Sequence, residues 1–206
     1  MANANVAFGF KPVGKHGSSP STQGTSQYFI ASDASAIFQG SPVKAELTGG
    51  TIQIGSASGN GDQLVGIFAG CEYVDASTGK LRFNNTWPGD GSANTDFDIK
   101  GFVYDDPSQR FIIAADGGNT SRATAKVDIF KTADIASGTS GSTTTGISSA
   151  VLDISTAEDT DTSNCVMILG IHEDVSNADH TAAGVSYIVK INNHALLSSD
   201  VDATAS

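Results

Sequence analysis

Residues 63–107 read QLVGIFAGCEYVDASTGKLRFNNTWPGDGSANTDFDIKGFVYDDP, and this stretch decides the fold class of the chain. An apolar row at every second position predicts a half-buried β-strand; its members are Val65, Ile67, Ala69, Cys71 and Tyr73. Residues 75–79 are of the types that reverse a chain, and Leu81 and Phe83 then fall on the inner face of a returning strand. The stretch therefore begins with a predicted β-hairpin.

The second half of the stretch predicts one more strand. Trp87, Pro88 and Gly89 end the hairpin, because proline has no N–H to donate to a ladder. A second alternating row follows, which consists of Phe97, Ile99, Gly101 and Val103 and ends at Asp105-Asp106-Pro107. Strands joined in this order predict an antiparallel sheet, in which no catalytic signature is visible.

Turn residues divide the rest of the chain into similar short segments. Strands are expected at 27–31, 36–39, 42–47, 51–54, 110–115, 124–129, 150–154, 164–172 and 184–192, and a single helical turn at 130–135. The segment 164–172 is too apolar for a strand with one solvent-exposed face, so it is expected at the centre of a sheet. About ten to twelve short strands predict an all-β fold, an antiparallel sandwich or barrel.

The N-terminal region combines a short apolar segment with a polar linker. Val6, Phe8 and Phe10 alternate, whereas residues 14–27 contain no large apolar side chain. Two interpretations are open: a first strand that folds back on its own sheet, or an extended arm that adds to a neighbouring chain. Three tethered apolar side chains would be a liability on a monomer, which favours the arm. We therefore expect an interaction segment that contains Val6, Phe8, Phe10 and Pro12.

These features divide the chain into three parts. Residues 1–26 are the expected arm and linker, residues 27–197 the β-domain, and residues 198–206 a flexible tail. Residues 136–146, ASGTSGSTTTG, are low in sequence complexity, and they begin the segment 136–149. We expect this segment to be mobile or held by ordered turns, and a subdivision of the β-domain near it stays open.

The charge of the chain argues against some classes of partner. Its 206 residues include 11 basic and 22 acidic side chains, a formal net charge of −11 at pH 7. Direct nucleic-acid binding and docking on an anionic membrane both need a basic surface, whereas a partner with positive patches is compatible. The N-terminus lacks the basic and apolar regions of a signal peptide, and no run approaches the ~20 apolar residues of a membrane span. We expect a soluble protein made in a cytoplasm.

The metal- and thiol-bearing residues do not form a recognisable site. Cys71 and Cys165 lie in apolar runs and are expected as buried thiols, with a disulfide only if their strands are adjacent. An acidic group near residues 153–161 lacks the glycine and terminal glutamate of an EF-hand, so a solvated loop is favoured over a calcium site; its members are Asp153, Glu158, Asp159 and Asp161. The histidines do not match a zinc motif; they are His16, His172, His180 and His194.

The candidates for catalysis are equally weak. Asp105 and Asp106 look like a turn, because a general acid/base pair would need a cleft and a perturbed partner. Residues 146–150 read GISSA, one position short of a nucleophile elbow, and the strand–turn–helix context is missing. We therefore expect a protein that is not an enzyme and has no cofactor.

Five ordered phrases in the sequence resemble a known family. They are GIFAGCEYVDASTGKLRFNNTWPG, VYDDPSQRFIIAADGG, GISSAVLDIS, VMILGIHED and SYIVKINNHAL. Together they resemble capsid-associated structural proteins of tailed bacteriophages, which we interpret as head decoration (cement) proteins. The resemblance covers residues 63–197 and supplies no active-site residues.

The resemblance implies a structural virion protein that binds and stabilises the outer surface of a phage capsid. Its implied partner is the major capsid protein, its implied assembly a homotrimer, and its implied location the capsid exterior. The alternative is a virion-surface carbohydrate- or receptor-binding β-module. Such a module would be expected to show an exposed aromatic platform, to which Trp87, the only tryptophan, would contribute.

Overall fold

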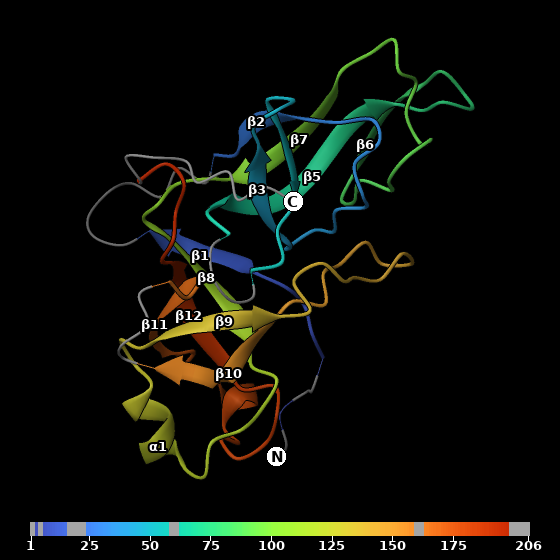
Figure 1. Cartoon of the computed structure of the whole chain (residues 1–206). Helices are drawn as coiled ribbons and strands as arrows, with labels where there is room; N and C mark the ends of the chain where they lie inside the picture. The colour runs from blue at the N-terminus through green and yellow to red at the C-terminus, as the bar shows by residue number, and fades with distance from the viewer. Residues whose placement is uncertain (1–2, 4–5, 16–23, 58–61, 159–162, 198–206) are drawn as a thin grey trace.

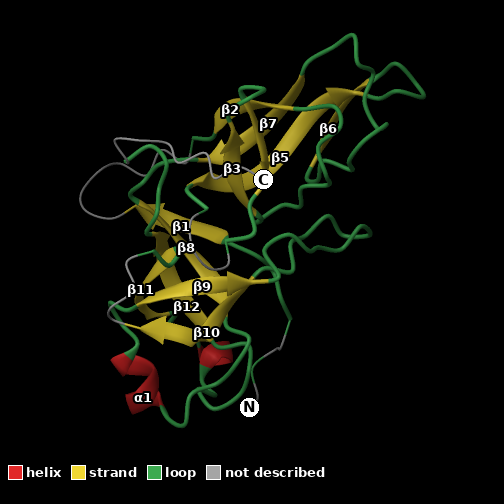
Figure 2. Cartoon of the chain, in the orientation of Figure 1, coloured by secondary structure: helices red, strands yellow, loops and turns green. Residues whose placement is uncertain are grey.

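In a computed structural model, the chain folds into two six-stranded β-sheets that lie one above the other in Figure 1. The structure describes residues 3, 6–15, 24–57, 62–158 and 163–197. Strand accounts for 46% of the structure and helix for 5%, and the few helical turns lie at one end of the molecule (Figure 2). The predicted all-β fold is confirmed. Within the described residues, no helix is long and apolar enough to cross a membrane.

Sheet A is built mainly from the C-terminal half of the chain. Its spatial order is β1 (Lys11–Lys15), β8 (Gln109–Ala114), β12 (Ser186–Ile191), β11 (Val166–Ile171), β9 (Thr132–Ala136) and β10 (Val151–Glu158). All of these neighbours pair antiparallel. The apolar strand β11 lies between two other strands, as its composition predicts.

Sheet B contains the stretch that decides the fold class. Its spatial order is β3 (Pro42–Glu46), β4 (Thr51–Ile54), β2 (Ser26–Ile30), β7 (Ile99–Tyr104), β5 (Leu64–Val74) and β6 (Leu81–Asn84). Because β3 also pairs with β5, five of these strands close into a small barrel. Among the strands that the structure describes, β6 pairs with β5 alone and lies outside this ring.

Strand β5 contributes to two separate hydrophobic cores. Leu64 and Ile67 pack in the core of sheet A, whereas Val65 and Phe68 pack in the core of sheet B. The prediction of a half-buried strand is therefore wrong. Its register shifts against both β3 and β7, so the simple alternation of faces is interrupted and both faces are covered.

The returning strand of the hairpin also differs from the prediction. Leu81 is 55% exposed and Phe83 is 71% exposed, so neither side chain points into the core. Phe97, expected on an inner face, is exposed as well. The turn itself is as predicted, with Gly79 at φ +64° and the Asp75 carboxylate accepting from the Thr78 backbone N–H at 2.8 Å. The predicted hairpin is therefore present, but its second strand, β6, is not part of the closed barrel.

In the segment after β8, the structure has a helix where a strand is expected and a strand where a helical turn is expected. Helix α1 (Arg122–Val127) replaces the strand expected at 124–129, and β9 occupies the expected helical turn at 130–135. Ser121 starts the helix, because its Oγ accepts from the Thr124 N–H at 3.2 Å. A second short element, the 3₁₀ turn η1 (Val175–Asn177), follows β11.

The division of the chain also needs correction. Strand β1 pairs with β8 of the same chain, so residues 11–15 belong to sheet A and not to a separate arm. Residues 105–108 connect β7 of sheet B to β8 of sheet A. The segment 136–149 instead connects β9 to β10, which are neighbours in one sheet. An ordered turn holds that segment, in which the Gly146 N–H donates to the Ser142 carbonyl at 2.7 Å. The Gln39 N–H also donates to the Gly146 carbonyl at 2.9 Å. Residues 16–23 of the expected linker and the expected tail, 198–206, lie outside the described residues.

Candidate functional site

The four residues of the expected interaction segment differ in exposure, although Phe8, Phe10 and Pro12 line one pocket of about 190 Å³. Phe10 is 3% exposed, and its ring packs edge-on against Phe111 at a centroid distance of 5.8 Å. Val6 is 64% exposed, Phe8 lies half-buried with the Lys11 ammonium 4.2 Å from its ring centroid, and Pro12 is half-buried in β1. Phe10 is thus a core residue, so Val6, Phe8 and Phe10 do not share one exposed face, and the role of the segment in an interaction stays a prediction.

A backbone turn explains why the alternation fails there. Gly9 has φ +65°, a conformation that favours glycine, and the next N–H, that of Phe10, donates to the Gly40 carbonyl at 2.9 Å. The chain therefore changes direction between Phe8 and Phe10, which directs the Phe10 ring into sheet A. Val6 and Phe8 remain at a separate pocket of about 450 Å³ beside His172 and Asp174.

Trp87 is not part of an exposed aromatic platform. It has no exposed surface, its indole N–H donates to the Ala34 carbonyl at 3.1 Å, and its ring packs edge-on against Tyr73. Its burial removes the one tryptophan from any surface that could stack on a sugar.

The candidate catalytic residues serve the fold. Asp106 pairs with Lys15 and accepts from the Ser108 N–H at 2.7 Å, and Asp105 accepts from the Tyr28 hydroxyl at 2.7 Å. Burial, with a further contribution from Asp105, raises the pKa of Tyr28 to about 12. Ser148, within residues 146–150, is buried and hydrogen-bonded to the Ser41 hydroxyl at 3.0 Å.

The remaining chemical candidates stay apart. Cys71 and Cys165 are buried free thiols, as predicted, and burial raises the pKa of each to about 12. Glu158 belongs to β10, which extends into the expected acidic loop, while Asp159 and Asp161 lie outside the described residues. His16 is outside them too. No group of three or more possible metal ligands occurs among the residues that the structure does describe.

One of the exposed apolar surfaces lies on the outer face of sheet B. The strand register places Phe29 beside Lys100, Lys100 beside Glu72, and Glu72 beside Phe83, in one row across β2, β7, β5 and β6. Cys71 and Tyr73 alternate with Glu72 and point into the core, so this row faces outward. The Lys100 ammonium lies 3.3 Å from the Glu72 carboxylate. The outer face of sheet B thus carries two exposed phenylalanines on either side of an ion pair.

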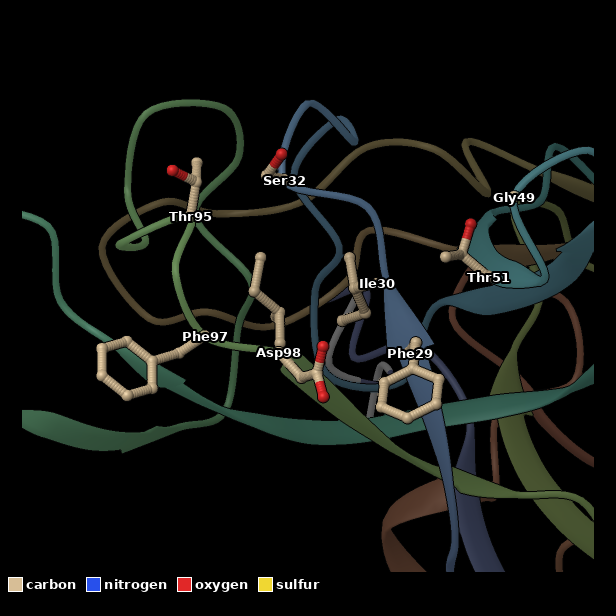
Figure 3. Close-up of a pocket in the computed structure, with 9 residues that line it drawn as sticks. Phe29, Ile30, Ser32, Gly49, Thr51, Thr95, Phe97 and Asp98 are labelled. Carbon is tan, nitrogen blue, oxygen red and sulfur yellow. The ribbon is translucent and has the colours of Figure 1, made fainter.

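One end of this row opens into a pocket of about 340 Å³ (Figure 3). Phe29 from β2 and Phe97 from the segment before β7 present their rings at its rim, 52% and 56% exposed. Asp98 lies between the two rings, and hydroxyl groups complete the wall; they belong to Ser32, Thr51 and Thr95. We call this the Phe29/Phe97 pocket. It can take an apolar group from a partner and offers polar groups around it.

Neither phenylalanine of the pocket was singled out as a site residue from the sequence. Phe29 lies in the short apolar run QYFIA and Phe97 begins an alternating row, so both look like core residues. The acidic residues on either side of Phe97, Asp96 and Asp98, are the one signal that the chain is near solvent there. Comparisons of the chain with protein-family models, with curated proteins and with solved structures find no match.

Proposed function

We propose that this chain is a structural protein of a phage virion that binds and stabilises the outer surface of the capsid. Its partner is the major capsid protein of the shell, and its binding surface is the Phe29/Phe97 pocket. It acts by contact alone, with no catalytic step and no cofactor. The resemblance of residues 63–197 to head decoration proteins supports the partner, and the exposed rings support the choice of surface.

The exposure of Phe29 and Phe97 carries this choice of surface. Each ring is about half exposed beside a pocket, and burying the remaining area of both would contribute roughly 1.5–3 kcal/mol. Because the chain has a net charge of −11, a shell surface that approaches it gains from positive patches. Shell binding should therefore combine an apolar anchor with a salt-dependent attraction.

Co-sedimentation with shells that lack this chain tests the proposal. The double variant Phe29→Ser/Phe97→Ser should fold, because both side chains are already half exposed, and should bind the shells at least about tenfold more weakly. Val175→Ser is the matched control, since Val175 is 87% exposed and lies in η1, away from sheet B. Equal shell binding by the double variant and the wild type would remove the pocket from the proposal.

A second candidate is a virion-surface module that binds a carbohydrate or a receptor. The chemistry of the same pocket favours it. Two aromatic rings lie on either side of the Asp98 carboxylate, and three hydroxyl-bearing side chains line the wall. Aromatic faces with nearby hydrogen-bonding groups suit a saccharide ring. The burial of Trp87 leaves phenylalanine to supply that aromatic surface.

Glycan-array binding separates the two candidates. A carbohydrate module should bind a defined saccharide in the absence of shells, and Asp98→Ala should abolish that binding without a loss of stability, because Asp98 lies at the exposed rim. A capsid-binding protein should give no saccharide signal and should retain shell binding in Asp98→Ala.

A further inference from the structure

The open edge of β6 is the least protected backbone in sheet B. Among the described residues, no strand pairs with the side of β6 that faces away from β5. Figure 1 shows the β5–β6 hairpin projecting from the barrel. An unpaired edge of this kind offers N–H and C=O groups to another strand.

The hydrogen-bond pattern of the hairpin fixes which groups point outward. The Asp75 N–H donates to the Lys80 carbonyl at 2.9 Å, so these two residues form a hydrogen-bonded pair. Such pairs alternate along an antiparallel ladder, so Leu81 and Phe83, opposite Val74 and Glu72, are in non-hydrogen-bonded positions. Their own N–H and C=O groups therefore point away from β5. The same two residues carry the exposed apolar side chains of the strand.

We propose that β6 pairs with β6 of a second copy of this chain, antiparallel and across a twofold axis at Phe83. In this register Phe83 lies opposite Phe83 of the other copy, and Leu81 lies opposite Asn85, the residue that follows β6. The outward N–H and C=O groups of both strands then satisfy one another. The occupant of the edge is thus an identical strand, in an isologous contact.

The charge of Arg82 favours a twofold axis at Phe83 over an axis one residue earlier, at Arg82. A twofold axis at Arg82 would place the Arg82 guanidinium of one copy directly opposite that of the other, a like-charge pair that destabilises a ladder. With the axis at Phe83, Arg82 faces the neutral Asn84 and keeps its contact with Asp75 at 2.7 Å. The hairpin also balances its charges, because Lys80 and Arg82 stand against Glu72 and Asp75. On a chain with net charge −11, such a neutral face lets two copies approach.

This pairing makes a dimer, whereas the resemblance implies a trimer, and it does not rest on shell binding. The mass in solution is the measurement, by light scattering on the eluting peak of the full chain, for which two copies give twice 21.0 kDa. Phe83→Glu and Phe83→Lys should each give a monomer, because a charge at the axis meets the same charge. An equimolar mixture of the two variants should restore the dimer, since opposite charges then meet.

The control is Phe130→Glu, a charge at a 75% exposed phenylalanine outside sheet B, which should leave the dimer intact. Thermal unfolding of every variant checks that the fold is kept, as the 71% exposure of Phe83 leads us to expect. A wild-type monomer or trimer overturns the pairing. So does a dimer that survives both Phe83 variants, or a mixture that stays monomeric. Shell binding is tested at Phe29 and Phe97 instead, so either proposal can fail alone.

Discussion

His194 is buried where the segment after β12 of sheet A meets β5 of sheet B, in an isolated bridge with Leu64. It is 2% exposed, and its Nδ1 accepts a hydrogen bond from the Leu196 N–H at 3.2 Å. The next residue, Ala195, packs in the core of sheet B, and its N–H donates to the Leu64 carbonyl at 2.9 Å. A proton on Nδ1 would remove the bond from Leu196, so the neutral ring suits this junction.

Burial lowers the pKa of His194 below the ordinary value of 6.5, although the carboxylates of Asp105 and Asp106 oppose the shift. The unfolded chain then binds a proton more readily than the folded chain does. The contribution of His194 to stability is complete above pH 6.5 and is lost as pH falls from there through the folded pKa. Each unit of pKa difference corresponds to about 1.4 kcal/mol.

Urea unfolding at about pH 7.5 and about pH 5.5 measures this effect. The wild type should lose stability over this interval, and His194→Gln, which cannot titrate, should lose less. Equal pH dependence of the two proteins would mean that His194 is not the group responsible.

Truncation of Phe10 should destabilise the fold and truncation of Val6 should not, although both residues belong to the same apolar segment. Phe10→Ala removes a buried ring that packs on Phe111, and we expect a loss of about 3–5 kcal/mol in the free energy of unfolding. Val6→Ala, at a 64% exposed position, should change it by about 0.5 kcal/mol or less. Chemical denaturation of both variants measures these changes. A Phe10→Ala variant as stable as the wild type would mean that Phe10 belongs to a free arm and not to the core.

At the scale of single elements, β5 lies so close to β7 that one position has no room for a side chain. A Cβ at Gly66 would lie 2.3 Å from the Tyr104 carbonyl oxygen and 2.7 Å from a methyl group of Val103. Gly66→Ala should therefore cost about 1–3 kcal/mol of stability. Gly170→Ala in β11 is the control, because a Cβ there meets nothing within 4 Å, and we expect a neutral or slightly favourable change. Equal melting temperatures for the two variants would contradict the packing of β5 on β7.

Strand existence could be predicted from the sequence, but the direction of several side chains could not. Period-two alternation found β7, β8 and β12 because each of these strands has one regular buried face. It failed at β5, where register shifts and a second core bury both faces. It also failed at β6, since the sequence contains no sign that the strand lies outside the closed ring.

The candidate site was the least predictable part for a related reason. Phe29 sits in an apolar run and Phe97 begins an alternating row, so both patterns are those of a core, whereas the structure leaves both side chains about half exposed. The helix at 122–127 was missed because Ala125 and Val127 fit an alternating pattern as well as a helical one. The Ser121 cap was the local signal that could have distinguished the two.

At the scale of the whole molecule, two β-cores share one long strand and leave few apolar groups on the surface of sheet B. Four of the exposed groups fall at two places, the Phe29/Phe97 pocket and the β6 edge, which the row through Lys100 and Glu72 connects. Leu47, which follows β3, is exposed as well. The proposed shell contact and the proposed contact between copies therefore use separate surfaces of sheet B.

The most direct test of the proposed function is the number of copies of this chain in purified virions. Quantitative mass spectrometry of the particles, with the major capsid protein as internal reference, gives that ratio. A decoration protein should be present at a copy number near that of the shell protein and should remain bound after purification. A chain that is absent from the particles, or present in far fewer copies as a receptor binder would be, contradicts the account.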